Sequence, residues 1–193
     1  MSKQILRSEI LKKRDAIPAS RRATLSKIIS NHLIRMLPAH DCRVGSYMTH
    51  GSEVDLMTLH KHLFISTHKC FVPRILTKTA MELAYLRNGA DIIRGRFGIR
   101  TSNQQITADI DALDWLIMPC VAFDPRGYRL GMGGGYYDRA LENCAPGAPI
   151  RIGVAFYQQK SKFEPDQWDK SLDWIVTENG LSANNCAVSN GDG

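Results

Sequence analysis

The sequence predicts an α/β fold, a single three-layer domain in which a mostly parallel sheet is flanked by helices, with a pair of helices at the N-terminus. Short apolar runs that suit buried strands alternate with segments of helical periodicity, which is typical of a parallel sheet. A length of 193 residues and a hydrophobic content of 44% suit one domain with one sizeable core. We assign this domain to residues 1–180 and expect the small, polar residues 181–193 to form a disordered tail.

The first two predicted elements are helices. In residues 3–14, Lys3 and Arg7 are four residues apart and share one helical face. The second helix follows Pro18 and is closed by Pro38. Its apolar residues keep a helical spacing: Leu25, Ile28, Ile29, Leu33 and Met36.

Strands and helices alternate through the rest of the chain. Strands are expected at residues 43–48, 70–72, 82–87, 115–118, 150–156 and 172–176, and helices at 56–64 and 136–143. The strand at 115–118 is an apolar run bounded by Asp114 and Pro119. In a sheet of this kind, ligand-binding loops follow the carboxyl ends of the parallel strands.

The segment from Arg129 to Arg139 is the most informative motif of the chain and reads RLGMGGGYYDR. It places four glycines within five positions, just before the start of a predicted helix. Glycine adopts positive φ without steric cost and lets main-chain N–H groups converge on an anion. The N-terminus of a helix also favours negative charge. The segment therefore predicts a phosphate-binding loop, and a glycine-rich turn without a ligand is the alternative.

The side chains around the glycines refine this prediction. The run lacks the lysine of a Walker loop, and Tyr136 stands where a dinucleotide fingerprint has its third glycine. Asp138, in the first helical turn, is placed to hold Mg²⁺ together with phosphate oxygens. Arg129 and Arg139 carry charge that can neutralise a phosphate chain, although either could equally lie in solvent.

These residues carry a resemblance to a known family. The segments DWLIMPCVAFD at 114–124 and RLGMGGGYYDR at 129–139 resemble the signature of the 5-formyltetrahydrofolate cyclo-ligases, also called methenyltetrahydrofolate synthetases. Weaker matches occur in the family's order up to Glu178: Lys3–Arg7, Tyr47–Met48, Glu53–Asp55, Phe71–Arg74, Phe97–Ile99, Trp168–Asp169, Leu172–Asp173 and Thr177–Glu178. The chain departs from the family pattern after Ile99, where Arg100-Thr101-Ser102-Asn103 replaces the usual Glu-Pro pair.

The resemblance implies an activity. It implies an ATP- and Mg²⁺-dependent enzyme that converts 5-formyltetrahydrofolate to 5,10-methenyltetrahydrofolate with release of ADP and phosphate. ATP would phosphorylate the formyl oxygen, N10 would attack the activated carbon, and phosphate would leave as the ring closes. Phosphoryl transfer depends on positioning and charge neutralisation more than on acid–base residues. We therefore assign no catalytic role to the six histidines, which lie between His32 and His68.

The resemblance also implies roles for single residues. Those expected to bind ATP are Lys3, Gln4, Ile5, Leu6, Arg7, Arg129, Leu130, Gly131, Met132, Gly133, Gly134, Gly135, Tyr136 and Tyr137. Those expected to bind the folate are Met48, Glu53, Met132, Gly133, Gly134, Gly135 and Tyr136. Among these, Glu53 would accept hydrogen bonds from the pterin. Asp138 and Asp173 would be the Mg²⁺ ligands, and Arg129 would neutralise charge during catalysis.

Charge, cysteine content and hydropathy favour a protein that binds anionic ligands and argue against zinc-binding, disulfide-rich and membrane-spanning proteins. The formal net charge of +6 suits anionic ligands such as ATP and a folate. The five scattered cysteines form no C-x-x-C pair, which argues against a zinc site or a disulfide framework. The N-terminus lacks a signal-peptide core, and no run is long enough to span a membrane. We therefore expect a cytoplasmic protein, and a monomer.

Two other classes stay open from the sequence. A catalytically silent relative would bind folate or nucleotide without turning over ATP. An RNA-binding α/β protein would use the positive charge and show a salt-dependent affinity that is insensitive to Asp138. The dispersed basic residues and the lack of an aromatic–basic RNA motif argue against nucleic acid as the partner.

Overall fold

A computed structural model of the chain describes residues 2–142, 144–145 and 147–183. The helices of this part are α1 (Lys3–Asp15), α2 (Ala19–Met36), α3 (Met57–Phe64) and α4 (Tyr136–Ala140), with short 3-10 helices η1 (Gly89–Asp91), η2 (Arg96–Gly98), η3 (Ile110–Ala112) and η4 (Tyr157–Gln159). The strands are β1 (Arg43–Gly45), β2 (Lys69–Ile75), β3 (Met81–Tyr85), β4 (Ile92–Arg94), β5 (Arg100–Ser102), β6 (Thr107–Ala108), β7 (Trp115–Pro119), β8 (Ala122–Phe123), β9 (Arg129–Leu130), β10 (Ile150–Val154), β11 (Trp174–Thr177) and β12 (Gly180–Ala183).

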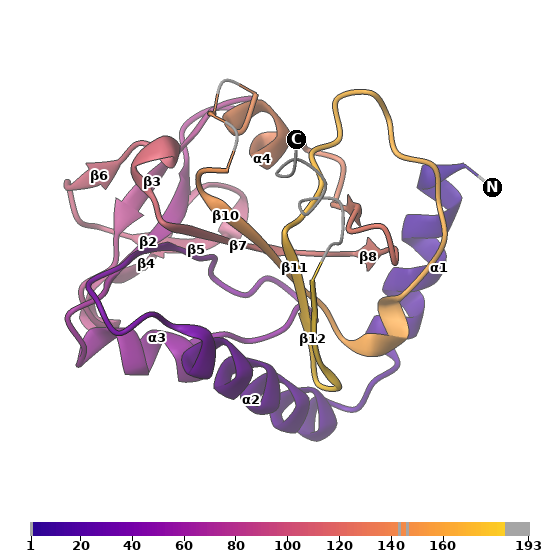
Figure 1. Cartoon of the computed structure of the whole chain (residues 1–193), viewed down its shortest axis with the longest axis horizontal. Helices are drawn as coiled ribbons and strands as arrows, with labels where there is room; N and C mark the ends of the chain where they lie inside the picture. The colour runs from indigo at the N-terminus through magenta and orange to yellow at the C-terminus, as the bar shows by residue number, and fades with distance from the viewer. Residues whose placement is uncertain (1, 143, 146, 184–193) are drawn as a thin grey trace, which may run out of the picture.

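One mixed sheet organises the fold (Figure 1). Its strand order is β12-β11-β10-β7-β1-β2-β3-β6. The strands from β11 through β2 are parallel, whereas β12, β3 and β6 are antiparallel additions at the two edges. The predicted α/β class with a mostly parallel sheet is therefore confirmed. Two antiparallel ribbons, β4–β5 and β8–β9, stand outside this sheet.

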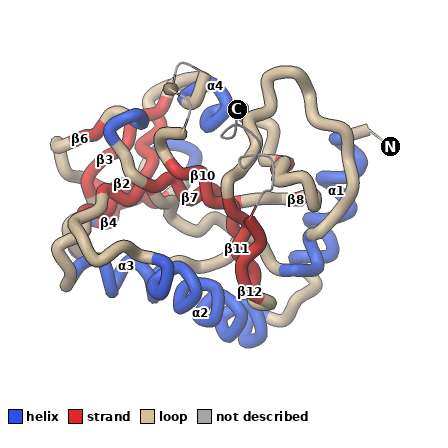
Figure 2. Tube along the Cα trace, viewed as in Figure 1, coloured by secondary structure: helices blue, strands red, loops and turns tan. Residues whose placement is uncertain are grey.

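The central strand β7 shows how both faces of the sheet are buried. Trp115 and Ile117 belong to the apolar cluster that includes residues of α2 and α3, whereas Leu116 and Met118 belong to a second cluster. Successive side chains of a strand point to opposite faces, so the two clusters cover the two faces. In Figure 1, α2 and α3 run along one face and α4 lies on the other side. Figure 2 shows that loops make up much of this second layer.

The two expected N-terminal helices are present, and they pack on different parts of the molecule. Helix α1 begins at the N-cap Ser2, packs Leu6 and Ile10 against the β8–β9 ribbon, and contacts η4. Helix α2 instead packs on α3, on the edge strand β12 and on its neighbour β11. The chain turns between them because Pro18 has an extended conformation and cannot continue α1. Lys3 and Arg7 of α1 thereby line the cavity described below.

The bounds of several segments differ from the sequence expectation; the strands expected at 82–87, 150–156 and 172–176 are β3, β10 and β11 with the bounds given above. Strand β1 ends at Gly45 rather than at residue 48, because the chain leaves the sheet there and buries Tyr47 elsewhere. Helix α4 ends at Ala140, not at residue 143, and Leu141 turns into the core. Residues 181–183, assigned to the disordered tail, instead form β12. The positive φ of Gly180 allows the tight turn that pairs this strand with β11. Residues 184–193 lie outside the described part.

Candidate active site

A cavity of about 410 Å³ opens where β1 and β7 end. Tyr47 and Met48 follow β1, and Pro119 to Val121 lie at the end of β7. The other walls come from α1, the glycine loop, the start of α4 and the segment that precedes β11. A cavity of this size, at the carboxyl ends of parallel strands, suits small-molecule ligands.

The glycine loop follows a short ribbon rather than a strand of the main sheet. The fully buried Asp124 accepts hydrogen bonds from the backbone of Arg126 and Tyr128, which fixes the turn between β8 and β9. The loop leaves β9 at Leu130 and enters α4 at Gly135, whose φ of 64° is left-handed. Glycine is therefore required by the backbone at this helix start, as the sequence predicts.

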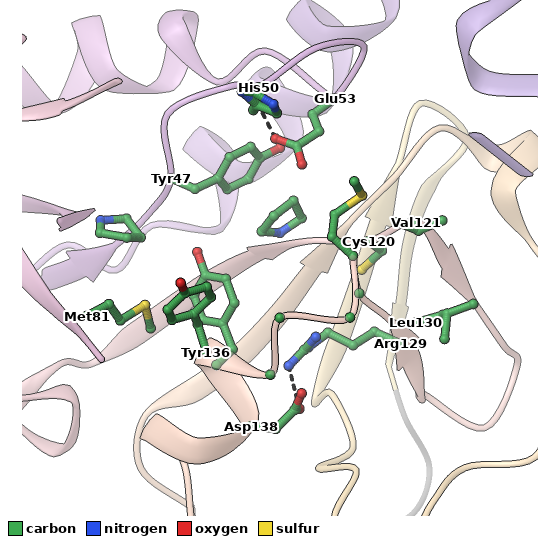
Figure 3. Close-up of a pocket in the computed structure, with 18 of the residues that line it drawn as sticks. Tyr47, His50, Glu53, Met81, Cys120, Val121, Arg129, Leu130, Tyr136 and Asp138 are labelled. Atoms are coloured by element: carbon green, nitrogen blue, oxygen red, sulfur yellow. Dashed lines mark hydrogen bonds and ion pairs between the residues drawn. The ribbon is translucent and has the colours of Figure 1, made fainter. Parts of the chain in front are cut away.

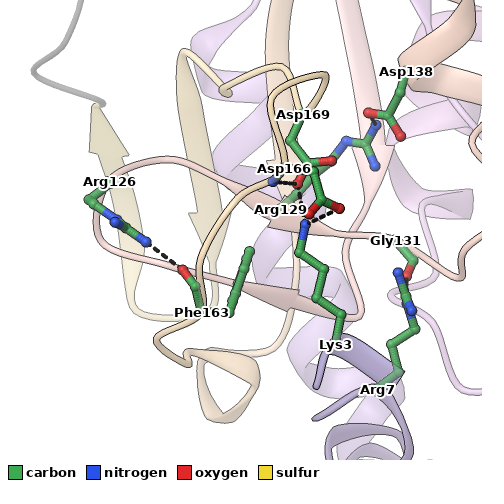
Figure 4. Close-up of polar contacts among 9 residues, drawn as sticks. All are labelled: Lys3, Arg7, Arg126, Arg129, Gly131, Asp138, Phe163, Asp166 and Asp169. Carbon is green, nitrogen blue, oxygen red and sulfur yellow. Dashed lines mark hydrogen bonds and ion pairs between the residues drawn. The ribbon is translucent and has the colours of Figure 1, made fainter. Parts of the chain in front are cut away.

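Arg7 connects α1 to this loop. Its Nε donates a hydrogen bond to the carbonyl oxygen of Gly131 at 2.8 Å (Figure 4). A side chain added at Gly133, which has a φ of 96°, would meet the Arg7 guanidinium at 3.6 Å. The guanidinium and the loop backbone thus face the same space, a suitable arrangement for an anionic ligand.

Arg129 lies under the loop and has a buried donor without a partner among the described residues. Its side chain is 7% exposed, and its Nη2 donates to Asp138 Oδ1 at 2.6 Å. The Arg129 Nε is buried without a hydrogen-bond partner among the described residues. A buried donor without a partner is costly, so this nitrogen points to a ligand acceptor. Figure 3 shows the Arg129–Asp138 pair beneath the cavity.

A second charged group lies at the N-terminus of α1. Lys3 Nζ contacts Asp169 Oδ2 at 2.6 Å and Asp166 Oδ2 at 2.7 Å (Figure 4). Burial lowers the pKa of the Lys3 ammonium, but the hydrogen bonds and charges of the two aspartates outweigh this effect, so the pKa is raised overall. Lys3 therefore stays charged, and all three side chains line the cavity.

Glu53 is the carboxylate at the opposite end of the cavity. It accepts a hydrogen bond from the backbone N–H of His50 at 3.0 Å (Figure 3). Burial raises the pKa of Glu53, against the opposing effects of that hydrogen bond and of the charge of Arg14. Arg14, 4% exposed in α1, donates to Ser52 Oγ at 2.9 Å and so connects this loop to the helix. Glu53 is thus a half-buried acceptor with capacity for ligand donors.

The structure brings most of the sequence-predicted residues together. Those that line the one cavity are Lys3, Arg7, Met48, Glu53, Arg129, Leu130, Gly131, Met132, Gly133, Gly134, Gly135, Tyr136, Tyr137 and Asp138. Gln4 and Ile5 are exposed on α1, and Leu6 is buried against the β8–β9 ribbon. None of these three lines the cavity, because a helix turns only some of its side chains toward one neighbour.

Asp173, the second expected Mg²⁺ ligand, does not line the cavity. Its carboxylate pairs with Arg151, accepting from the backbone N–H at 2.7 Å and from Nη2 at 3.1 Å. It precedes the first residue of β11, whereas the cavity lies where the parallel strands end. Asp169 is the carboxylate of this segment that lines the cavity. The signal for it was present in the Trp168–Asp169 match to the family.

Other chemistries find little support in the described residues. No group of three or more His, Cys, Asp and Glu side chains there could hold a metal ion alone. Cys42, Cys70, Cys120 and Cys144 are free thiols, and Cys186 lies outside the described part. Burial raises the pKa of Cys120, which lines the cavity, to about 12, so it is no thiolate nucleophile at neutral pH. None of the described helices is long and apolar enough to cross a membrane.

Known proteins are similar to this chain in sequence and in fold. A family model described as the 5-formyltetrahydrofolate cyclo-ligase family matches residues 1–178. The chain is 30% identical over 176 residues to the 5-formyltetrahydrofolate cyclo-ligase of Haemophilus influenzae, an alignment that covers 88% of this chain and 94% of that relative. The 5,10-methenyltetrahydrofolate synthetase structure from Aquifex aeolicus matches with a TM-score of 0.83 and 31% identity, over 100% of this chain and 97% of that chain. The corresponding structure from Mycoplasma pneumoniae matches with a TM-score of 0.76 and 27% identity, over 92% and 99% of the two chains.

Proposed function

The chain belongs to the 5-formyltetrahydrofolate cyclo-ligase family, and we propose that it uses MgATP to convert 5-formyltetrahydrofolate into 5,10-methenyltetrahydrofolate. The family suggested by the sequence motifs is thereby confirmed, and the chain is an enzyme of this kind. The observation that carries the use of both substrates is that one and the same cavity has a carboxylate acceptor at one end and cationic donors around a glycine loop at the other.

The cationic end suits the triphosphate. Lys3 and Arg7 face it from α1, and Arg129 offers a buried Nε without a partner. These groups would hold the γ-phosphoryl group in line with the formyl oxygen and neutralise the charge that develops during transfer. The role is positioning, because phosphoryl transfer needs little covalent participation by the protein.

Two carboxylates suit the metal. Asp138 and Asp169 line the same cavity, each held by a cation, Arg129 and Lys3 respectively. Mg²⁺ usually binds through one or two carboxylates together with substrate phosphates and water. When bound, the ion would stabilise negative charge on the transferred group. We propose Asp138 and Asp169, rather than Asp138 and Asp173, as its protein ligands.

The other end of the cavity suits the pterin. Glu53 would accept hydrogen bonds from the pterin N–H groups, and Met48 would pack against the ring. Held in this way, N10 of the folate can attack the carbon of the O-phosphorylated formyl group. The C–O bond then breaks, and phosphate leaves with the oxygen and the N10 proton as the five-membered ring closes.

One assay tests the proposal. The protein is mixed with 5-formyltetrahydrofolate, ATP and Mg²⁺, and the absorbance of the methenyl product is followed beside ADP release. We expect one ADP per methenyl product and no turnover without ATP or with a chelator. Binding of folate without turnover would indicate a silent relative. Salt-sensitive RNA binding without folate binding would indicate the nucleic-acid alternative.

A further inference from the structure

The β4–β5 ribbon carries arginines without acidic partners. Arg94 and Arg100 are exposed and lie directly opposite one another in its register, and Arg96 is exposed in the connecting helix η2. Residues directly opposite in an antiparallel pair project on the same face, with their Cβ atoms about 5 Å apart. Within the described part of the chain, none of the three guanidinium groups makes an ion pair or a side-chain hydrogen bond.

Three arginines without acidic partners on one ribbon destabilise the folded protein when no ligand is bound. Like charges directly opposite each other in a ribbon are destabilising. Neighbouring arginines are compensated, since Arg74 contacts Glu82 at 2.6 Å and Arg87 contacts Asp91 at 3.5 Å. The ribbon arginines therefore have their full charge available for an anion from outside the chain.

The ribbon borders the cavity. Ile99 and Arg100 both line it, together with the apolar side chains of Pro73, Ile75 and Met81. Figure 3 shows Met81 and Arg129 on opposite sides of Tyr136. The cavity thus has a third, apolar side at Met81, away from both Glu53 and Arg129 (Figure 3), and the exposed Arg100 belongs to the same lining.

The chemistry of the substrate fits this third side. A folate consists of a pterin, an aromatic p-aminobenzoyl group and a glutamate whose carboxylates can be extended by further γ-linked glutamates. With the pterin at Glu53 and the triphosphate at Arg129, the aromatic group can lie on the apolar side and the glutamate can reach Arg100, which lines the cavity. Arg94, opposite Arg100 in the ribbon, and Arg96 lie outside the lining. We propose that Arg94, Arg96 and Arg100 bind the γ-polyglutamate tail of the substrate, an inference that rests on the proposed function.

The experiment compares two substrates that differ only in the tail. Affinity and turnover are measured with the monoglutamate and the pentaglutamate of 5-formyltetrahydrofolate, for the wild type and for the double variant Arg94→Gln/Arg100→Gln. The control is Arg35→Gln, an exposed arginine of α2 without a side-chain partner among the described residues. Circular dichroism checks that the variants fold, and a charge-reversed pair, Arg94→Glu/Arg100→Glu, extends the series.

We expect the double variant to lose affinity for the pentaglutamate and to bind the monoglutamate nearly as the wild type does. Exposed ion pairs are each weak, so we expect the wild type to bind the pentaglutamate about 10-fold more tightly than the monoglutamate at low salt. In the double variant this ratio should fall to about 2, with a change of at most about 3-fold for the monoglutamate. Salt should reduce the wild-type ratio because it screens exposed charges.

Two results would overturn the inference. Equal losses for the two substrates would mean that the arginines act on the common part of the folate or on the fold. An unchanged ratio in both double variants would mean that the tail leaves the cavity elsewhere. Either result is distinct from failure of the proposed function, in which the wild type would not cyclise the monoglutamate at all.

Discussion

Asp169 and Asp173 are four residues apart, yet their carboxylates have different surroundings. Asp169 contacts Lys3 in the cavity, whereas Asp173 is bound by Arg151 near the start of β11. Spacing in the sequence could not separate them, because the connection before β11 has no periodic structure from which a direction could be predicted. The family resemblance assigns Asp173 to the metal, whereas the three-dimensional contacts place Asp169, and not Asp173, at the cavity.

This difference gives the first prediction. Asp169→Asn and Asp138→Asn should each lower Mg²⁺-dependent turnover by about 100-fold or more, because metal stabilisation of a phosphoryl group contributes several kcal/mol. Asp173→Asn should retain turnover and lower the melting temperature by a few degrees, because Arg151 loses its partner. Rates measured over a range of Mg²⁺ concentrations, beside thermal unfolding, distinguish these outcomes. A metal requirement altered by Asp173→Asn alone would restore the original pair of ligands.

Glu53 is the residue on which recognition of the pterin depends. Glu53→Gln keeps the size of the side chain but replaces one acceptor with a donor, which would face a pterin N–H. Losing a charged hydrogen bond and burying an unpaired donor costs on the order of 2–4 kcal/mol, or roughly 30- to 1000-fold in folate affinity. The affinity for ATP should stay near that of the wild type. Separate titrations with the two ligands measure this, and equal losses for both would assign Glu53 to the fold.

At the scale of elements, the glycine loop could be predicted from the sequence, but the β8–β9 ribbon from which it emerges could not. The sequence places the loop before a helix, and α4 does begin at Tyr136. The two-residue strands β8 and β9 are too short to show a period, so the ribbon that carries the loop was missed. The ends of β1 and α4 were overextended because apolar residues beyond them pack in turns rather than in regular structure. Residue propensities cannot distinguish an apolar residue in a strand or helix from one that is buried in a turn.

The loop gives an element-scale prediction. Gly133→Ala places a side chain at a φ of 96°, so the backbone must shift, and the strain is roughly 1–2 kcal/mol. We expect the affinity for ATP to fall about 10-fold, with a smaller change for the folate. Gly180→Ala is the matched control, since its φ of 118° is also left-handed but it lies in β12, outside the cavity lining. A loss of stability without a change in ATP affinity at Gly133 would contradict a phosphate-binding role.

For the whole molecule, the sequence predicts the fold class better than the assembly of the site. Alternation of strands and helices is enough to place a ligand at the carboxyl ends of the strands, where the cavity lies. It could not predict that α1 would cross to the β8–β9 ribbon and bring Lys3 to Asp169, because 166 residues separate that pair. A contact between residues this far apart in the sequence depends on the whole topology, and the local spacing of apolar residues cannot predict it. The monomeric state stays a prediction.

The stability of the whole molecule should depend on one buried histidine that the reaction does not use. His60, 1% exposed in α3, contacts Ser46 Oγ through Nε2 at 2.9 Å, and its Nδ1 has no partner among the described residues. Burial lowers the pKa of His60 to about 4, against the opposing charge of Asp55. Protonation would bury a charge and leave an Nδ1–H without an acceptor.

The sign of the pH effect follows from this lowered pKa. The unfolded chain binds a proton at His60 near pH 6.5, and the folded chain near pH 4. The neutral ring therefore stabilises the fold fully above pH 6.5, and its contribution is lost as the pH falls toward 4. The total loss is about 3 kcal/mol, at about 1.4 kcal/mol per pH unit. Urea unfolding at pH 7, 5.5 and 4 should show this fall in the free energy of unfolding. In His60→Gln, the slope of the free energy of unfolding against pH should decrease by the equivalent of about one proton. The control is His40→Gln, because His40 is exposed. An unchanged slope in a folded His60→Gln protein would assign the acid sensitivity to other groups.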